Sequence, residues 1–298
     1  MKGLTVRTRH LAAIAALAIS TGASASAGVI VLNVPNANQT VLNGISNDFT
    51  LVGTYEVNGY YYSFTYNPST NVWHYPINVP NEAQTTAWST NTLGQLVGYY
   101  AEPYWQNSQY FFGFAEWKSG VFSELFVNEC IEGIQPAGIN DNSAVTGSCI
   151  TGVESNGQQI QMAFETYPAD VTFACFGSVA TVPYAVNNFG QMVGFFLGGG
   201  GVPNGFISTD QGYCSVVNYP GAGSTVLTGI NDVGDITGFY TKGSGNVQSF
   251  ILKGSTYTPV NIPGATAVSI GQINNDGWYV GNYVDSKGQH AFFAHTAP

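Results

Sequence analysis

The stretch Gly229-Ile-Asn-Asp-Val-Gly-Asp-Ile-Thr-Gly-Phe-Tyr240 decides the fold, because it occurs six times along the chain in recognisable form. The other copies begin at Gly44, Ser89, Gly138, Ala185 and Gln272. Aligned on their second glycine, the six copies place Gly53, Gly98, Gly147, Gly194, Gly238 and Gly281 at spacings of 45, 49, 47, 44 and 43 residues. A period in this range predicts one supersecondary unit that is built six times.

Each repeat predicts four short antiparallel strands. In the fifth repeat they fall at residues 226–230, 235–240, 248–252 and 257–262, with turn residues between them. The chain has 37 Gly, 18 Tyr and 18 Phe but only 8% charged residues, a composition poor in helix formers and rich in strand and turn formers. Four strands per repeat predict an all-β fold, a six-bladed β-propeller of four-stranded antiparallel blades.

Two positions in the repeat have a physical explanation. In the Asn-Asp-x-Gly segment the Asx side chain bonds its own backbone and the glycine supplies positive φ for a bulged hairpin. The second glycine lies within a strand, where it allows a neighbouring chain to approach closely or the strand to bend. A small residue followed by Phe also recurs in the third strand of every repeat, and we expect each ring to lie between adjacent sheets. These are Phe64, Phe114, Phe164, Phe206, Phe250 and Phe292.

The two ends of the chain predict how the ring closes. The last repeat stops after its third strand, at Ala291-Phe292-Phe293, and lacks a fourth. Near the other end, Val29-Ile-Val-Leu-Asn-Val-Pro-Asn36 resembles the fourth strand Thr258-Pro-Val-Asn-Ile-Pro-Gly264 of the fifth repeat. The first strand should therefore complete the last blade, which removes two open sheet edges and gives one domain over residues 28–298.

Residues 1–27 have the pattern of a secretory signal peptide. Lys2, Arg7 and Arg9 precede an apolar run, and Ala25-Ser26-Ala27 supplies the small residues of a cleavage site. The apolar run is too short to span a bilayer, and no later stretch is long enough. We therefore expect a secreted or periplasmic protein without a membrane span.

The charge balance excludes some partners. Three of the 7 Lys+Arg lie in the signal, so the mature chain has four lysines, no arginine and 17 acidic residues, a net charge of −13. Such a surface repels the phosphates of nucleic acids and anionic membranes. We expect no nucleic-acid partner, and we expect a monomer.

All four cysteines lie in the mature chain, and an even number in an exported protein favours disulfides. Four cysteines allow three pairings, of which we predict Cys130–Cys149 and Cys175–Cys214 because each would tie neighbouring repeats. Free buried thiols are the alternative.

The repeated Ile-Asn-Asp-x-Gly-x-Ile-x-Gly-x-Tyr phrase, followed by a small residue and Phe, resembles the bacterial extracellular repeat proteins of the HAF type. The resemblance covers essentially the whole mature chain. It implies secretion from a bacterium and a propeller-like array, and it brings no agreed catalytic residues. Many relatives end in an apolar sorting helix with a basic tail, whereas this chain ends Ala294-His-Thr-Ala-Pro298, which argues against surface anchoring.

Ligand binding is expected on the face that carries the loops of variable length. These loops span 56–62, 101–110, 150–161, 197–204, 241–248 and 284–289, opposite the uniform Asn-Asp-x-Gly turns. Aromatic rings in two of them could stack on a sugar while polar neighbours bond its hydroxyls, or they could simply cover the blade tops. The candidate ligand-binding residues are Tyr60, Tyr61, Tyr104, Trp105 and Asn107.

Metal and catalytic signals are weak. Asn231-Asp232-Val-Gly-Asp235 looks like part of a calcium loop, but only this repeat has the third acid and turn chemistry already explains it, so we expect no cofactor and keep calcium as a minor alternative. The histidines show no zinc-ligand spacing. The acids and histidines that could act in catalysis, rather than as solvated loop charges, are Glu102, Glu116, Glu154, His74 and His290.

The sequence therefore favours a secreted binding or scaffold protein that recognises a neutral glycan or another extracellular partner through its variable loops. The alternative is a glycan-degrading hydrolase or lyase that uses carboxylates or a His/Tyr pair in the central pocket. A third hypothesis is a structural envelope component without a ligand. No assembled catalytic set is visible, so we favour binding over catalysis.

Overall fold

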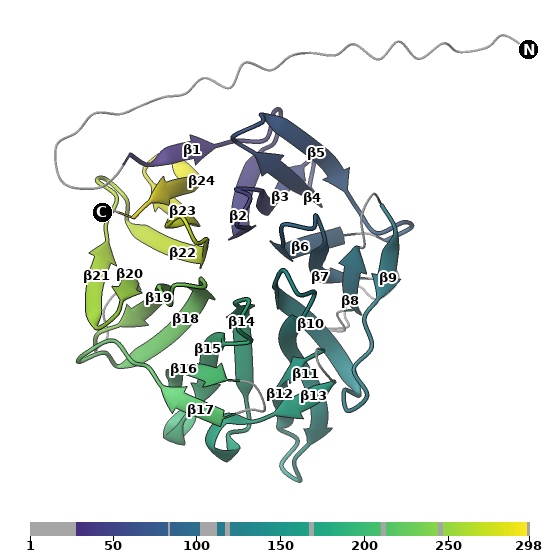
Figure 1. Ribbon diagram of the computed structural model, residues 1–298, viewed down its shortest axis with the longest axis vertical. Helices are drawn as coiled ribbons and strands as arrows, with labels where there is room; N and C mark the ends of the chain where they lie inside the picture. Colours follow the sequence, from purple (N-terminus) through teal and green to yellow (C-terminus); the bar gives the residue numbers. More distant parts are fainter. Residues whose placement is uncertain are drawn as a thin grey trace, which may run out of the picture.

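The protein is a closed ring of six sheets. The computed structural model describes residues 28–82, 84–101, 112–116, 120–166, 170–209, 213–243 and 247–296. Six four-stranded antiparallel sheets surround a central axis (Figure 1). The predicted six-bladed β-propeller is confirmed. The predicted signal, residues 1–27, lies outside the described residues.

The strands are numbered in chain order, and each blade runs from an inner strand at the axis to an outer strand at the rim. Blades 1 and 2 are β2 (Gln39–Ile45), β3 (Leu51–Val57), β4 (Tyr60–Asn67), β5 (Val72–Ile77), and β6 (Gln84–Thr90), β7 (Leu96–Ala101), β8 (Phe112–Glu116), β9 (Phe122–Glu124). Blades 3 and 4 are β10 (Glu132–Ile139), β11 (Val145–Val153), β12 (Gln159–Glu165), β13 (Val171–Phe173), and β14 (Thr181–Val186), β15 (Met192–Leu197), β16 (Pro203–Thr209), β17 (Tyr213–Val216). Blades 5 and 6 are β18 (Ser224–Ile230), β19 (Ile236–Thr241), β20 (Gln248–Lys253), β21 (Thr256–Val260), and β22 (Ala267–Ile273), β23 (Trp278–Asp285), β24 (Gly288–His295), β1 (Ile30–Leu32).

Two short 3₁₀ helices, η1 (Cys175–Gly177) and η2 (Gly199–Gly201), lie in connections. Among the described residues, no helix has the length and apolarity that a membrane crossing requires.

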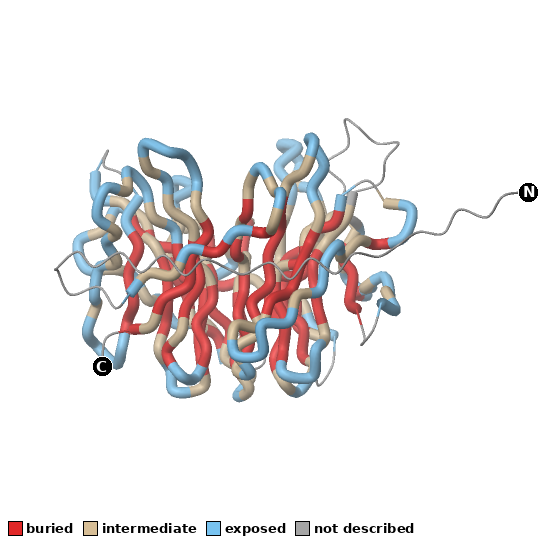
Figure 2. The backbone as a smooth tube through the Cα atoms, turned by 90° about the horizontal axis from the view of Figure 1, so that it is seen from above, coloured by how far each residue is buried: buried red, intermediate tan, exposed pale blue. Residues whose placement is uncertain are grey.

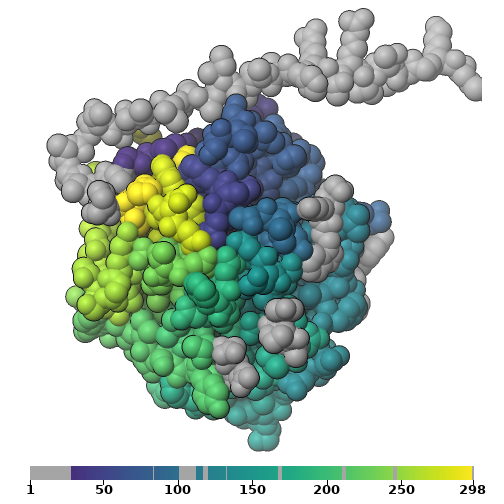
Figure 3. Space-filling model, viewed as in Figure 1, coloured from purple at the N-terminus to yellow at the C-terminus, as the bar shows by residue number. Residues whose placement is uncertain are grey.

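The ring closes as the sequence predicts. Strand β1 pairs antiparallel with β24, and Val31 lies opposite Phe292 in the ladder. In the space-filling view the first and last strands, purple and yellow, lie side by side (Figure 3). The last blade thus takes its outer strand from β1, at the start of the described residues, and so has four strands like the others.

A bulge in every inner strand explains the second glycine of the repeat. The ladder between the first two strands skips a residue directly after the one that faces this glycine, as between Leu42 and Gly44 in blade 1. The bulge pushes an inner-strand carbonyl against the glycine: a Cβ on Gly53 would lie 2.0 Å from the backbone oxygen of Val41, and one on Gly194 would lie 2.0 Å from that of Val182. No larger residue fits this site unless the backbone moves.

The core repeats in the same way. The six predicted phenylalanines are each at most 1% exposed and are the largest fully buried side chains among the described residues. Buried positions form a middle layer of each blade, between two layers of exposed turns and loops (Figure 2). The prediction of one buried ring per blade is confirmed.

Both predicted disulfides are present. Cys130 bonds Cys149 and Cys175 bonds Cys214, with no free cysteine in the described chain. Each bridge differs in one respect from the prediction that it ties two repeats. Cys130 and Cys175 lie in the connections that enter blades 3 and 4, and their partners lie in those same blades, on β11 and β17. The bridges therefore fasten each connection to the blade it enters.

Candidate functional site

The bulge residues of the inner strands line the central axis. One such residue directly precedes each copy of the repeated phrase, and the six are Asn43, Trp88, Ala137, Tyr184, Thr228 and Gly271. Five of them line a chamber at the end of the axis where the variable loops lie. Their sizes differ sharply: two are large aromatics, and the others are small. The frame is sixfold, but the chamber is not.

Two aromatic residues, Trp88 and Tyr184, line one side of the chamber, and a further ring lies beside each of them. Trp88 and Tyr184 stack with ring centroids 6.5 Å apart and an interplanar angle of 25°, although they come from blades 2 and 4. Tyr99 lies 6.3 Å from Trp88, and Phe195 lies 6.1 Å from Tyr184. We call Tyr99, Trp88, Tyr184 and Phe195 the aromatic shelf. Blade 3, which lies between these two blades, carries only Ala137 at its bulge.

The remainder of the chamber is lined by Phe239 and by aliphatic, amide and hydroxyl side chains. Its volume is about 540 Å³, which lies in the usual range for small-ligand sites, about 300–1,000 Å³. Polar groups come from Asn43, Thr228, Ser269, Asn282 and Gln289. None of the described lining residues is charged. Because a buried charge without a partner is costly, such a chamber favours an uncharged ligand.

Burial keeps the tyrosines of the shelf neutral. Loss of solvent raises the pKa of Tyr184 above its ordinary value, and the nearby Tyr99 raises it further. Burial likewise raises the pKa of Tyr99, although a hydrogen bond with Thr86 opposes this. Of the two, Tyr184 lines the chamber, and its protonated phenol offers an O–H group beside an apolar ring, a combination suited to sugars.

Several polar groups of the chamber hold its walls together. The Nδ2 of Asn43 donates to the backbone oxygen of Ala87 at 2.9 Å, across the junction of blades 1 and 2. Asn282 exchanges two hydrogen bonds with the backbone of Leu42, at 3.0 and 2.9 Å, and so joins blades 6 and 1. Within the described residues the Oδ1 of Asn43 accepts no hydrogen bond, which leaves an acceptor for a ligand hydroxyl.

Between the chamber and the turn end of the axis lies one long side chain, that of Gln272, which we call the floor. The first residue of the repeated phrase is small in five blades: Gly44, Ser89, Gly138, Ala185 and Gly229. In blade 6 it is Gln272, which is 7% exposed and reaches across the axis. Its Nε2 donates to the Oγ of Ser89 at 3.1 Å and to the backbone oxygen of Ala137 at 3.2 Å. The glutamine thus fills the space that five small residues leave.

Beyond this floor, the turns of the repeated phrase close the opposite end of the axis. In five blades the turn begins with an asparagine whose Nδ2 donates to the backbone oxygen of the equivalent residue in the next blade, at 2.9–3.3 Å. The donors are Asn91, Asn140, Asn187, Asn231 and Asn274. In blade 1, Ser46 takes this place, and its Oγ bonds within its own turn, to Asp48 and Thr50.

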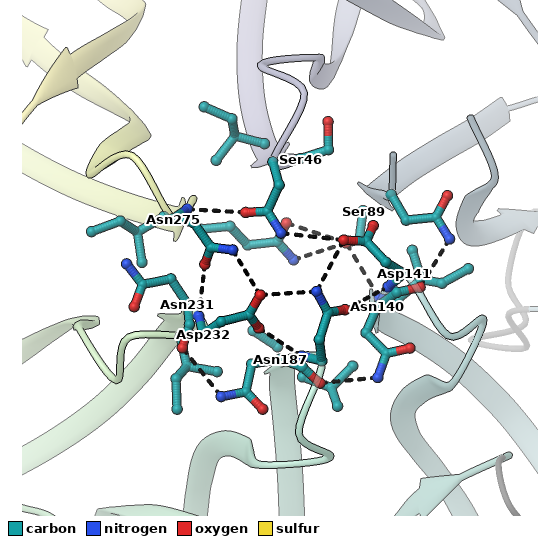
Figure 4. Close-up of a pocket in the computed structure, with 18 of the residues that line it drawn as sticks. Ser46, Ser89, Asn140, Asp141, Asn187, Asn231, Asp232 and Asn275 are labelled. Carbon is teal, nitrogen blue, oxygen red and sulfur yellow. Dashed lines mark hydrogen bonds between the residues drawn. The ribbon is translucent and has the colours of Figure 1, made fainter. Parts of the chain in front are cut away.

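The next residue of each turn forms a second row of links. Backbone N–H groups donate to the side-chain oxygen of the equivalent residue in the following blade at 2.8–3.0 Å, for Thr92, Asp141, Asn188, Asp232 and Asn275. Figure 4 shows these side chains pointing toward one another around the axis. We call the two rows, residues 46–47, 91–92, 140–141, 187–188, 231–232 and 274–275, the Asx belt. The pocket it leaves is only about 50 Å³.

The predicted loop site is only partly described. Tyr60 and Tyr61 lie at the start of β4, beside the β3–β4 turn, and are 59% and 40% exposed. They do not line the axial chamber. Tyr104, Trp105 and Asn107 lie outside the described residues. The exposure of Tyr60 and Tyr61 leaves them free to contact a ligand, so this site stays a prediction.

The structure brings together two of the predicted catalytic residues. His74 and Glu116 line one cleft of about 650 Å³ between blades 1 and 2. The Oε1 of Glu116 accepts a hydrogen bond from the backbone N–H of Gly120 at 2.7 Å, and its buried Oε2 has no partner within the described chain.

The other catalytic candidates lie elsewhere. Glu154 accepts a hydrogen bond from Asn156 in the β11–β12 turn. His290 stacks on Tyr283 and lies 3.0 Å from Asp285. Glu102 is outside the described residues. No described candidate lines the axial chamber, so the structure offers no support for catalysis in the central pocket.

The segment that resembles a calcium loop holds its side chains apart. The Oδ1 of Asn231 accepts the backbone N–H of Asp235, four residues on, at 2.8 Å, so this side chain is used within its own turn. Asp232 accepts hydrogen bonds from Asn188 and Asn275, while Asp235 faces Lys253 at 3.4 Å. Within the described residues, no group of three or more His, Cys, Asp or Glu is placed to hold a metal ion.

Sequence reasoning missed the chamber, yet a signal for it exists. The residue before each phrase and the first residue of each phrase are two columns of the repeat, and both vary in size. Trp88 and Tyr184 stand out in the first column and Gln272 in the second. In a ring, one column of inner-strand residues meets at the axis, so differences within that column shape the site.

Comparisons with known proteins agree with the fold. No family model matches the sequence, and no curated protein is similar to it. The chain is similar to the β-propeller domain of the Trilobed protease from Pyrococcus furiosus, at 11% identity and a TM-score of 0.56, covering 91% of this chain and 85% of that one. It is also similar to an Aleuria aurantia lectin in complex with Fucα1-6GlcNAc, at 11% identity and a TM-score of 0.52 (88% and 96%).

A third similar structure is a catalytically inactive virginiamycin B lyase from Staphylococcus aureus with quinupristin, at 10% identity and a TM-score of 0.51, covering 90% and 99% of the two chains. Binding proteins and enzymes both occur among these propellers. At such identities the likeness shows the fold alone.

Proposed function

We propose that the protein is a secreted binding protein that holds an uncharged glycan in the axial chamber, against the aromatic shelf. The observation that carries this proposal is the chamber itself: a ligand-sized space with an aromatic wall, amide and hydroxyl groups opposite, and no charged residue among its described lining. Stacking on Trp88 and Tyr184 would provide apolar contact, and Asn43 would accept a hydroxyl. The lectin among the similar structures supports the idea by analogy only.

Secretion has support from two sides. Two disulfides are typical of chains that fold in an oxidising compartment, and residues 1–27 have the pattern of a signal peptide. The HAF-type resemblance points the same way. Detection of a mature chain that begins at Gly28 in culture medium or periplasm would test this part of the proposal.

A panel of neutral glycans tests the binding site. Wild type and Trp88→Ala are compared on the same array, and we expect the substitution to weaken the best ligand tenfold or more, about 1.4 kcal/mol. Tyr60→Ala and Trp105→Ala test the loop site in parallel. Tyr213→Ala, which removes a 75% exposed ring at the rim, is the matched control and should leave binding unchanged. Binding that depends on Trp105 but not on Trp88 would move the site to the loops.

The second candidate function, glycan degradation, is favoured by the cleft between blades 1 and 2. It holds a histidine and a buried carboxylate whose Oε2 is unpaired, groups that acid–base chemistry uses. Assay of a polysaccharide panel with wild type, Glu116→Gln and His74→Ala tests it. Activity lost in both variants but kept in Trp88→Ala would identify an enzyme with its site in this cleft.

A further inference from the structure

The central axis is closed at two levels on one side of the chamber. Gln272 crosses it first, held by Ser89 and Ala137. The Asx belt follows, with a remaining pocket of about 50 Å³. Both levels are tied by hydrogen bonds to the inner strands of several blades. A ligand that enters the chamber from the loop face therefore meets a fixed floor.

The floor is tightly built. A Cβ on Gly44 would lie 2.5 Å from the Oε1 of Gln272, and a Cβ on Gly229 would lie 2.7 Å from its Cα. The glycines of neighbouring blades thus pack directly against this residue. Both amide atoms of the glutamine are bonded and the residue is 7% exposed, so its side chain is held in place across the axis.

From this geometry we infer that the chamber receives the uncharged terminal sugar of a glycan and not an internal segment of a chain. This inference rests on the proposed function and deepens it. An internal sugar continues in two directions, so it needs two exits, and within the described residues Gln272 and the Asx belt occupy the axis on the side away from the loop face. A chain lying across that mouth would contact the rim, where Val247, Val284 and Gln289 lie, without reaching the ring of Trp88 between the inner strands.

The chamber also selects the chemistry of that terminal sugar. A terminal uronic or sialic acid would bring a carboxylate into a space whose described lining supplies no cation. No group would offset the free-energy cost of removing this carboxylate from water, so glycans that end in an acidic sugar should bind poorly. The protein would therefore distinguish chain ends by charge as well as by position.

The experiment uses a glycan array in which each neutral oligosaccharide is printed in two forms, with its end free and with one further neutral sugar added to that end. For the best ligand, we expect the capped form to bind at least tenfold more weakly than the free form. Equal binding of the two forms would overturn the inference but leave the proposed function standing. Absence of binding to every neutral glycan would overturn both.

A variant that fills the chamber provides an independent test. Thr228→Trp places at the blade 5 bulge the residue that blade 2 carries at Trp88, and it should abolish binding of the free end. Thr256→Trp, the same substitution at an exposed position of the outer strand β21, is the matched control and should bind within about threefold of wild type. If Thr228→Trp folds, with an unchanged melting temperature, and still binds the free end, the ligand lies outside the chamber. If Thr228→Trp does not fold, the comparison of free and capped glycans on the wild-type protein still tests the inference.

Discussion

The two ends of the central axis are built from the same six strands but differ in what varies. At the turn end, the Asx belt repeats nearly the same side chains, and in five of the six blades the asparagine bonds the next blade. At the loop end, the side chains at the bulge positions differ in size, from none at Gly271 to the large ring of Trp88, and they leave a chamber. Uniform residues in a ring close it, because each blade offers its neighbour the same partner. Different residues break the symmetry and create a site.

This contrast predicts that substitutions in the uniform frame lower stability, while substitutions in the chamber lower binding. The largest effect should come from the second glycine of the repeat. In Gly194→Ala the new Cβ would lie 2.0 Å from the backbone oxygen of Val182, so the inner strand must shift. We expect the free energy of unfolding to fall by about 2–4 kcal/mol in urea denaturation.

The control for this prediction is another glycine without such contacts. Gly223→Ala meets nothing closer than 3.7 Å and does not need positive φ, so its unfolding free energy should change by less than about 0.5 kcal/mol. Similar losses in the two variants would mean that the bulge does not impose the glycine.

The Asx belt should respond next most strongly. Asn187 is 3% exposed, and its side chain bonds the backbone oxygen of Asn231 and the backbone N–H groups of Phe189 and Gln191. Asn187→Ala leaves these buried groups unpaired, and we expect a loss of about 2 kcal/mol in unfolding free energy. Ligand binding in the chamber should stay as in wild type. A large loss of binding with intact stability would show that this end of the axis also carries function.

How much of this was visible in the sequence depends on whether the feature is local. The strands, the turns, the buried phenylalanines and the closure by β1 follow from short-range patterns that recur six times, so each copy checks the others. The disulfide pairing was also predicted correctly, but not its role, because each bridge fastens a connection to the blade it enters and does not tie two repeats. The loops of variable length do not recur from repeat to repeat, so one copy could not be checked against another.

The chamber was not predicted because it depends on differences between repeats and on their meeting in space. Trp88 and Tyr184 are 96 positions apart in the chain and touch only because blade 3 carries Ala137 between them. In a single strand, each aromatic is indistinguishable from a core residue. Only after the ring is known does one column of the repeat become one surface, and then Gln272 becomes its floor.

A smaller effect is expected from acid. Burial tends to raise the pKa of Asp141, but hydrogen bonds from the backbone N–H of Thr92 and from the side chains of Asn188, Thr92 and Asn47 bring it below its ordinary value. A lowered folded-state pKa stabilises the fold above the unfolded value near 3.8, and this contribution is lost as pH falls through the lower folded value.

Asp141→Asn removes that titration and should reduce the loss of unfolding free energy between pH 5 and lower values, measured by denaturation at each pH. Asp285→Asn, at an exposed hairpin, is the comparison outside the belt, since hydrogen bonds from Lys287 and His290 also lower the pKa of Asp285. An unchanged pH profile in Asp141→Asn would show that the belt does not depend on this carboxylate.

The smallest effect concerns the one place where the belt is incomplete. Ser46 is too short to reach the blade 2 turn and bonds Asp48 and Thr50 instead, so the junction of blades 1 and 2 lacks the link that the other five junctions have. Ser46→Asn supplies the missing amide, whose Nδ2 could donate to the backbone oxygen of Asn91 as its equivalents do. We expect a gain of about 0.5–1 kcal/mol in unfolding free energy, the usual net value of one buried hydrogen bond. Ser46→Ala, which removes the present bonds without adding the link, should lose stability. If Ser46→Asn is also destabilising, then this junction is spaced differently from the rest. In that case the missing bond does not explain the cleft of about 650 Å³ beside this junction, which His74 and Glu116 line, and the cleft results from the spacing of blades 1 and 2.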